Sequence, residues 1–221
     1  ACVKRYLEKK QTQVSTGSYD RERRALEDFL SVVPELEDAS SVDHETVSRY
    51  REHLETRMGD GLAAATAQGY FGAFKRFVRY LVDFGQLEHT PRNLDSKILA
   101  IRVETKAVEV WDTDELREVL QAAPARTRLY FLLCLNCGMY PSDISDLRKD
   151  EVSLDAGTIT RRRSKTKDRK TAPTVTYSLW PETVELLRQE ESEDAVRFLT
   201  NAKGLPLVRS SIRDDGKETK I

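Results

Sequence analysis

The 221-residue sequence contains few cysteines and no long apolar run. Three cysteines cannot build a disulfide framework, which favours a reducing compartment. No apolar segment reaches the roughly 20 residues needed to cross a bilayer, and no signal-peptide pattern opens the chain. With 39% hydrophobic and 33% charged residues, the chain is expected to be globular, with one large domain or two. Its net charge of −1 means that only local clusters of charge can indicate a polyanionic partner.

The first third of the chain has the pattern of a helical domain. The strongest periodicity covers residues 64–83, where the apolar positions form one helical stripe. Three earlier segments also predict helices, and Pro34 would stop the second of them, for which Ser18 is the expected N-cap. Those segments are residues 2–11, 19–33 and 44–56, and the apolar stripe of 64–83 is Ala67, Tyr70, Phe74, Phe77, Val78 and Leu81.

The opposite face of the helix over 64–83 carries Gln68, Lys75, Arg76 and Arg79. One interpretation is a solvated back of a core helix, because charged helix faces are usually just hydrated. The other is a surface that binds the backbone of DNA. Residues 84–110 then show little periodicity, which predicts a linker, and we place the domain boundary near Thr105.

The second part of the chain predicts helices around a small sheet. Asp112 and Glu115 have capping-box spacing before a helix whose side chains Leu116, Val119 and Leu120 would face inward. Residues 127–137 are apolar nearly all round, as in a helix buried on most sides. Short strands are predicted over 152–154, 158–162, 174–179 and 196–199, with a tight turn at 155–157 and a helix over 181–190.

Residues 135–152 read Leu-Asn-Cys-Gly-Met-Tyr-Pro-Ser-Asp-Ile-Ser-Asp-Leu-Arg-Lys-Asp-Glu-Val. Gly138 suits the left-handed position that ends a helix, and Pro141 suits the first position of a following one. The segment resembles the first active-site box of tyrosine recombinases (phage-type integrases), T-G-x-R-x-S-E-L-x-x-L-x-W-x-D. The box positions filled here are the Gly, Ser, acidic and two Leu positions, by Gly138, Ser142, Asp143, Ile144 and Leu147.

Tyr140 stands where that box has an arginine. The resemblance implies metal-free and cofactor-free transesterification, in which a tyrosine attacks a DNA phosphodiester and two arginines hold the phosphate bidentately. A tyrosine has one donor and no cation, and losing such a charge is expected to raise the barrier by about 3–4 kcal/mol. The implied active-site positions are Tyr140, Asp143 and Lys165. Tyr140 is not expected to be the nucleophile, since no arginine–histidine constellation surrounds it in the sequence.

Residues 161–170 hold seven cations against one anion, between two predicted strands. Such a cluster invites a polyanion, although a solubilising loop or a charge-protected edge strand has the same composition. Recombinases place a catalytic lysine in this hairpin, and Lys165 matches it, with Lys167 as the alternative. By resemblance, Lys165 would protonate the leaving 5′ oxygen. The other cations assigned to DNA binding here are Arg161, Arg162, Arg163, Lys167 and Arg169.

The resemblance implies a mainly α fold with a small antiparallel sheet. Residues 1–105 would form a four-helix SAM-like core-binding domain with its linker, and 106–221 a partial α+β catalytic domain. In the family, a His-x-x-Arg box and the nucleophilic tyrosine follow later, whereas the histidines here are His44, His53 and His89, so we expect those groups outside this sequence. Cys134 and Cys137 have the spacing of half a zinc site, but buried thiols are the preferred interpretation.

The leading hypothesis is site-specific DNA recombination and integration by the full-length protein through a phosphotyrosyl intermediate, with this chain binding double-stranded DNA. The alternative is a catalytically inactive DNA-binding relative, and a third hypothesis is a helical protein-interaction module. DNA affinity that falls steeply with salt would exclude the third hypothesis. We expect a monomer in solution, a tetramer of the full-length protein on DNA, no membrane association, and a cytoplasmic, nucleoid-associated location.

Overall fold

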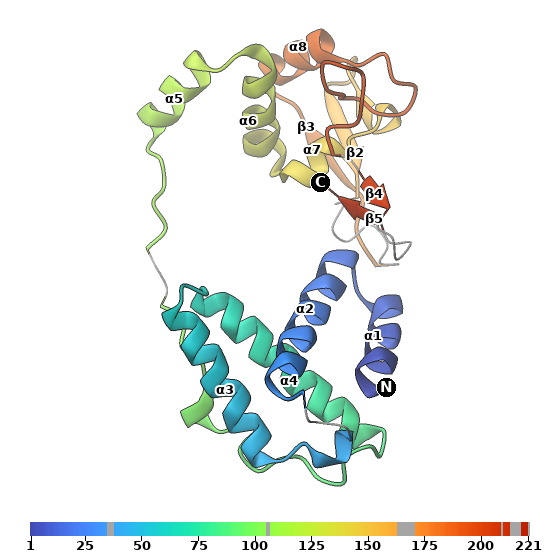
Figure 1. Cartoon of the computed structure of the whole chain (residues 1–221). Helices are drawn as coiled ribbons and strands as arrows, with labels where there is room; N and C mark the ends of the chain where they lie inside the picture. Colours follow the sequence, from blue (N-terminus) through green and yellow to red (C-terminus); the bar gives the residue numbers. More distant parts are fainter. Residues whose placement is uncertain (35–37, 105–106, 163–170, 209, 213–217, 221) are drawn as a thin grey trace. The chain divides into compact units, whose positions relative to one another are not determined.

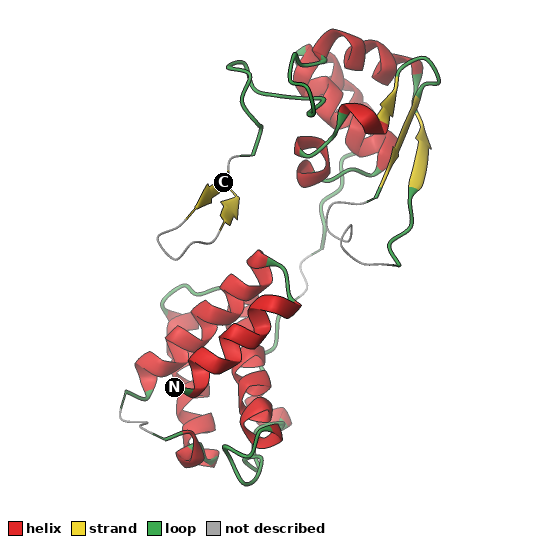
Figure 2. Cartoon of the chain, turned by 90° about the vertical axis from the view of Figure 1, so that its right-hand side faces the viewer, coloured by secondary structure: helices red, strands yellow, loops and turns green. Residues whose placement is uncertain are grey.

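The computed structural model describes residues 1–34, 38–104, 107–162, 171–208, 210–212 and 218–220, and the chain forms two compact units. The units are Ala1–Ala107 and Val108–Ile221. In both, helices dominate (Figure 2). The predicted fold class, mainly helical with a small antiparallel sheet, is confirmed.

The described part of the first unit contains four α-helices (Figure 1): α1 (Cys2–Gln13), α2 (Thr16–Val32), α3 (His44–Gly59) and α4 (Ala64–Asp83). Helix α4 has the predicted bounds and packs against the other three. Phe71, which is not among the predicted core residues, belongs to the buried stripe of α4. Tyr70, which is among them, is only half-buried. The prediction of Ser18 as N-cap of α2 is wrong, because the helix starts at Thr16 and Ser18 donates its backbone N–H to Ser15 within the first turn.

A return segment, residues 91–101, lies along the first unit and includes the 3₁₀ turn Lys97–Leu99. Leu94 and Ile101 are buried in the helical core. The Arg51 side chain donates to the Leu99 carbonyl at 2.9 Å, and the Gln68 amide donates to the Ile101 carbonyl at 3.0 Å. Much of the predicted linker therefore packs against the helices of the first unit, because its few apolar side chains are buried in the helical core.

The second unit contains the helices α5 (Thr113–Ala122), α6 (Ala125–Cys137), α7 (Pro141–Ser145) and α8 (Pro181–Glu190). Its three-stranded antiparallel sheet runs in the order β1 (Val152–Ser153), β2 (Thr158–Arg161), β3 (Val175–Ser178), and a separate pair joins β4 (Ser210–Ile212) to β5 (Glu218–Lys220). The register pairs Ile159 with Val152 on one side and with Tyr177 on the other. The core of this unit gathers side chains from α6, α7, α8 and β2, among them Leu133, Ile159 and Leu187.

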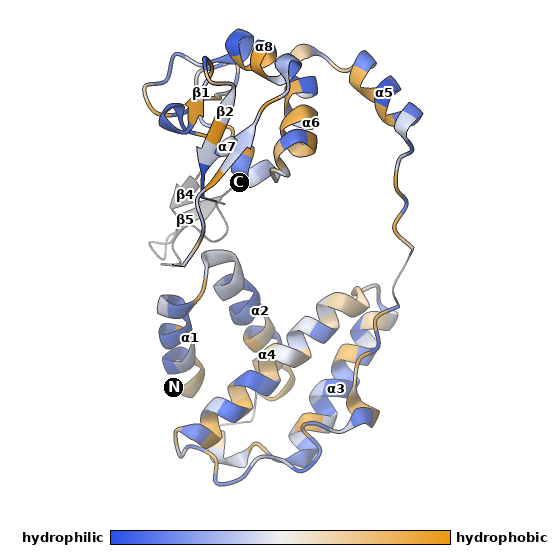
Figure 3. Cartoon of the chain, turned by 180° about the vertical axis from the view of Figure 1, so that it is seen from behind, coloured by the Kyte–Doolittle hydropathy of each residue, from blue (hydrophilic) through white to orange (hydrophobic). Residues whose placement is uncertain are grey.

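Two predictions for the second unit are wrong. Residues 196–199 form no strand, since Arg197 makes only an isolated bridge with Arg148, although Phe198 and Leu199 are buried. Helix α6 is buried along one side only, with Leu135 44% exposed, and the hydropathy colouring shows both polar and apolar residues along it (Figure 3). The predicted inward side of α5 is confirmed, since Leu116, Val119 and Leu120 are half-buried and Leu120 packs against the core, although no residue of the helix is fully buried.

Candidate functional site

The turn between α6 and α7 is built as predicted. Gly138 has φ +60° and ends α6 with its N–H donated to the Cys134 carbonyl at 2.9 Å. Its left-handed conformation is one that residues with a Cβ rarely adopt. Met139 is buried beside the core, and Pro141 begins α7. The backbone therefore reverses direction within a few residues and leaves position 140 at the outer edge of the unit.

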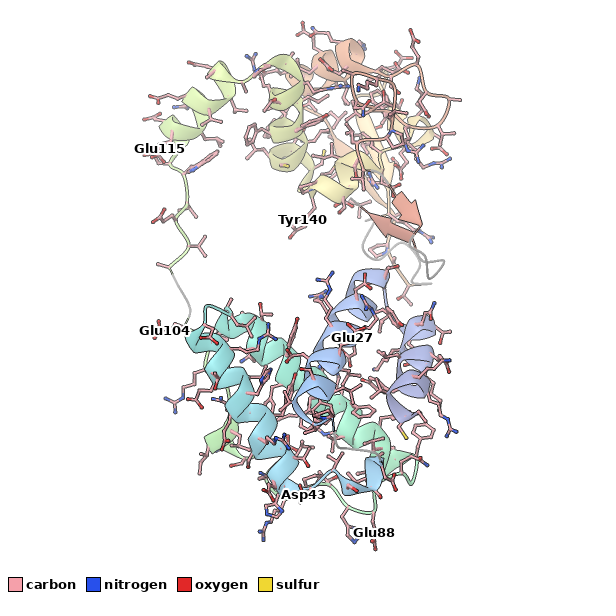
Figure 4. The ribbon with its side chains drawn as sticks, in the orientation of Figure 1. Glu27, Asp43, Glu88, Glu104, Glu115 and Tyr140 are labelled. Carbon is pink, nitrogen blue, oxygen red and sulfur yellow. The ribbon has the colours of Figure 1, made fainter. Side chains whose placement is uncertain are left out.

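Tyr140 and Asp143 are brought together by reciprocal hydrogen bonds. The Tyr140 N–H donates to the Asp143 carboxylate at 3.0 Å, and the Asp143 N–H donates to the Tyr140 carbonyl at 2.8 Å. Asp143 is 4% exposed, whereas Tyr140 is 57% exposed and its side chain points away from the unit (Figure 4). Asp143 thus caps the short helix and fixes the backbone of position 140, while the side chain at 140 faces outward.

Arg161 lies inside the second unit, beneath the turn. Its guanidinium Nη1 donates to the Asp143 carbonyl at 2.6 Å and lies 3.7 Å from the Glu151 carboxylate, and the side chain is 4% exposed. This burial does not favour the predicted contact with DNA. Ile159 and Arg161 face the same, buried side of β2. Because side chains alternate along a strand, the sequence could have predicted that Arg161 shares the buried side with Ile159.

The other cations near this site bind neighbouring side chains or lie outside the described residues. Arg162 is exposed and donates to the Thr174 hydroxyl at 3.3 Å. Arg148, which follows the box, donates two hydrogen bonds to Asp150, at 2.9 and 3.2 Å. Lys165, with Arg163, Lys167 and Arg169, lies outside the described residues.

The polar face of α4 is engaged by partners within the first unit. Arg79 Nη2 donates to both oxygens of the Asp95 carboxylate at 2.8 and 3.0 Å, and Lys75 Nζ lies 3.4 Å from the same group. Arg76 donates two hydrogen bonds to Glu22 on α2, at 3.1 and 2.6 Å. Gln68 binds the return segment, as described above, so all four predicted DNA-binding positions on α4 have intramolecular partners.

Glu22 is a buried carboxylate held by two donors. Its side chain is 10% exposed and accepts hydrogen bonds from Arg76 and from the Tyr6 hydroxyl. Burial alone would raise the pKa of Glu22, but the hydrogen bonds from Arg76 and Tyr6 outweigh it and leave the pKa lowered. Burial, followed by the bond to Glu22, raises the pKa of Tyr6 above its ordinary value. The network therefore keeps Glu22 ionised and joins α1, α2 and α4.

No helix among the described residues is long and apolar enough to cross a membrane, and those residues hold no group of three or more potential metal ligands.

Cys137 is buried, which raises the pKa of its thiol to about 11. Cys134 is exposed, so its predicted burial is wrong; it lies on the side of α6 that faces away from the core.

Beside α2 and α4, an open groove of about 560 Å³ is lined by Arg21, Gln68 and Arg76 among others.

Comparison with known proteins identifies the first domain and the fold of the chain. Residues 1–98 match the phage integrase SAM-like domain. Most of the chain superposes on the λ integrase fragment 75–356, in its dimer bound to a COC′ core site, with a TM-score of 0.69. Residues 1–98 therefore belong to the phage integrase SAM-like domain family, and the chain has the fold of the phage integrases. The λ match covers 93% of this chain and 71% of that one at 14% identity, which by itself establishes the fold.

Two further proteins are similar to this chain. The Tn1549 transposon integrase, in complex with a circular intermediate DNA, superposes with a TM-score of 0.64 at 14% identity, over 91% of this chain and 72% of that one. The Escherichia coli (strain K12) "Putative defective protein IntQ" is 24% identical over 183 residues, 77% of this chain and 45% of that protein. The chain thus spans less than half the length of this curated relative.

Proposed function

We propose that this chain binds double-stranded DNA as part of a tyrosine recombinase, and that the whole protein serves site-specific DNA recombination and integration. The observation that carries the proposal is the presence of both recombinase parts in one chain. Residues 1–98 are a SAM-like integrase domain, and the second unit has the α6–Gly138–α7 turn followed by an antiparallel sheet. The λ and Tn1549 integrases of the same fold were both solved bound to DNA.

In the recombinase reaction a tyrosine hydroxyl attacks the scissile phosphodiester while two guanidinium groups neutralise the phosphate. The backbone of the turn supports a phosphate contact by residue 140, since Asp143 fixes the backbone there and the side chain points outward. The side chain itself is a phenol, which offers a phosphate one hydrogen bond and no positive charge. Proton donation by Lys165 to the leaving oxygen belongs to the same proposal.

The alternative is a DNA-binding relative that has lost strand cleavage, and the contacts of the described cations favour it. For Arg161 to reach a phosphate beside Tyr140, it would have to leave the Asp143 carbonyl and Glu151 inside the unit. For Arg148, two hydrogen bonds to Asp150 would have to be replaced. Neither guanidinium is placed as a substitute for the family arginine, and the relative named as a defective protein is consistent with this alternative.

Cleavage of a nicked suicide substrate by the whole protein tests these two versions. The variants are Tyr140→Arg and, as a matched control, Ser142→Arg, which adds the same guanidinium at a neighbouring exposed position. DNA binding is measured on the same samples by fluorescence anisotropy. A covalent protein–DNA adduct from the natural protein supports the recombinase version. An adduct from Tyr140→Arg but not Ser142→Arg supports the inactive version, with residue 140 as the cause. Absence of DNA binding, or affinity that does not change with salt, contradicts both.

The assembly and location follow from the same proposal. We propose a monomer in solution, a tetramer of the whole protein on DNA, and a cytoplasmic, nucleoid-associated location. Among the structural relatives, one λ integrase structure is a tetramer bound to a Holliday junction. Light scattering of the chain without DNA tests the first point, and a stable dimer would contradict it.

A further inference from the structure

Lys75 and Arg79 of α4 form a two-cation fork around one carboxylate. They lie one helical turn apart, so both cations project from the same side of the helix. Arg79 binds both oxygens of Asp95, at 2.8 and 3.0 Å, and Lys75 approaches one of them at 3.4 Å. A planar guanidinium with an adjacent ammonium is the arrangement that also binds a phosphate group.

The Asp95 carboxylate is positioned by its own turn, so its location does not depend on the two cations. Its neighbour Leu94 is fully buried, and Asn93 donates to the His44 carbonyl at 2.8 Å. The Ser96 N–H closes the turn by donating to the Asn93 carbonyl at 3.0 Å. The fold thus presents an anion to the fork from a fixed position.

Burial of the carboxylate distinguishes this fork from the other ion pair on α4, because the two arginines are equally exposed. Glu22, which binds Arg76, has a side chain that is 10% exposed, and Tyr6 also donates to it. Breaking that pair would leave a charge buried without its partner, which is strongly unfavourable. In the fork, Asp95 is 62% and Arg79 49% exposed, while Lys75 is 21% exposed, and the exposed pair of Asp95 with Arg79 contributes little to stability. Asp95 can therefore exchange for another anion, whereas Glu22 cannot.

We propose that the Lys75–Arg79 fork is a binding site for one DNA phosphate and that the Asp95 carboxylate competes with the phosphate for it. The inference rests on the proposed DNA binding and deepens it. It assigns Arg76 to the internal structure of the domain and Lys75 with Arg79 to the nucleic-acid surface. It also makes Asp95 a residue that weakens DNA binding and reduces its dependence on salt.

The test is a salt titration of DNA affinity with the full chain and a labelled duplex of random sequence. The variant Asp95→Asn removes the competing charge and keeps the shape of the side chain. The matched control is Glu88→Gln, which removes one negative charge from the same unit. Glu88 is 89% exposed on the loop after α4 and points away from the helices (Figure 4). Circular dichroism and the melting temperature check that both variants fold.

One added phosphate contact steepens the slope of log K against log salt by about 0.9. If such a contact contributes nothing at 1 M salt, Asp95→Asn is expected to bind about 15-fold tighter at 50 mM and about 4-fold tighter at 200 mM. Glu88→Gln is expected to keep the natural slope. Adding Arg79→Gln to Asp95→Asn is expected to remove the gain.

Three results would overturn the inference. Equal slopes for Asp95→Asn and Glu88→Gln, with DNA still bound, would reject the competing carboxylate and leave the proposed function intact. A gain that persists after Arg79→Gln would place the new contact elsewhere. Absence of DNA binding by the natural chain and by every variant would reject the inference together with the proposed function.

Discussion

Arg161 offers a sharp test of how the candidate site is held together. Replacing it with alanine removes a buried guanidinium that bridges β2 to the start of α7. The Asp143 carbonyl loses the donor at 2.6 Å, and Glu151 loses a cation at 3.7 Å. The stem of the side chain, which is also buried, leaves a void behind it.

The expected magnitude follows from these losses. An unsatisfied buried carbonyl costs about 1–3 kcal/mol, and removing one member of a buried ion pair costs about 3–5 kcal/mol. Glu151 is 19% exposed, so water partly replaces its partner and the lower range applies. We expect Arg161→Ala to destabilise the second unit by about 3 kcal/mol, which at an m-value of about 2 kcal/mol/M lowers the urea midpoint by about 1.5 M.

Tryptophan fluorescence gives a selective assay. The sequence has two tryptophans, Trp111 and Trp180, and both belong to the second unit. Their emission therefore follows unfolding of that unit alone, while circular dichroism reports the helices of both units. The control is Arg162→Ala, which removes an adjacent exposed arginine whose side chain donates to the Thr174 hydroxyl, and it should change stability by less than about 0.5 kcal/mol.

A specific result would refute this reasoning. If Arg161→Ala unfolds at the same urea concentration as Arg162→Ala, the guanidinium contributes nothing to the unit. The side chain would then lie in solvent, and its predicted place among the DNA-binding cations would regain support. A large shift in midpoint instead assigns Arg161 to the support of α7 and Tyr140.

Three further changes test individual elements. Gly138→Ala should destabilise the second unit by about 1 kcal/mol in a urea titration, because alanine is strained at φ +60°. No clash adds to this cost, since an added Cβ would have no atom within 4 Å. Asp112→Ala removes the cap of α5 and costs that helix about 1 kcal/mol; since α5 has no buried residue, hydrogen exchange should accelerate over residues 113–122 and stay unchanged in α6. Glu22→Gln should destabilise the first unit at pH 7, because the lowered pKa of Glu22 stabilises the fold only above the unfolded value. The difference from the natural chain in thermal unfolding should therefore shrink as the pH falls below about 4.

Local patterns predicted the elements whose signals lie within a few residues. The bounds of α4 and α8 agree with the structure. The capping box of Asp112 and Glu115 is present with both hydrogen bonds, at 2.9 Å each. Gly138 and Pro141 ended and began their helices as expected. In each case the physical cause, a backbone conformation or a side chain that caps its own helix, is written in adjacent residues.

Tertiary contacts explain the errors. Residues 196–199 have the composition of a strand, yet two backbone bonds to the segment around Leu147 and Lys149 hold them as a bridge instead. The apolar content of α6 suggested burial all round, whereas the described core covers one side of it. The burial and the strand pairing of a segment depend on the distant residues that pack against it, and its own sequence does not specify those residues.

The charged face of α4 shows what this means for function. Periodicity placed its cations on one side of the helix, but it could not say which of them were neutralised, because the partners lie 54 residues away for Arg76 and 16 for Arg79. Counting cations from the sequence would assign three equal phosphate contacts to this face. Burial of the carboxylate separates them, since the Glu22 side chain is 10% exposed and the Asp95 side chain is 62% exposed. The salt dependence of DNA binding should therefore report the exchange of one carboxylate for one phosphate, and not the sum of the positive charges on the helix.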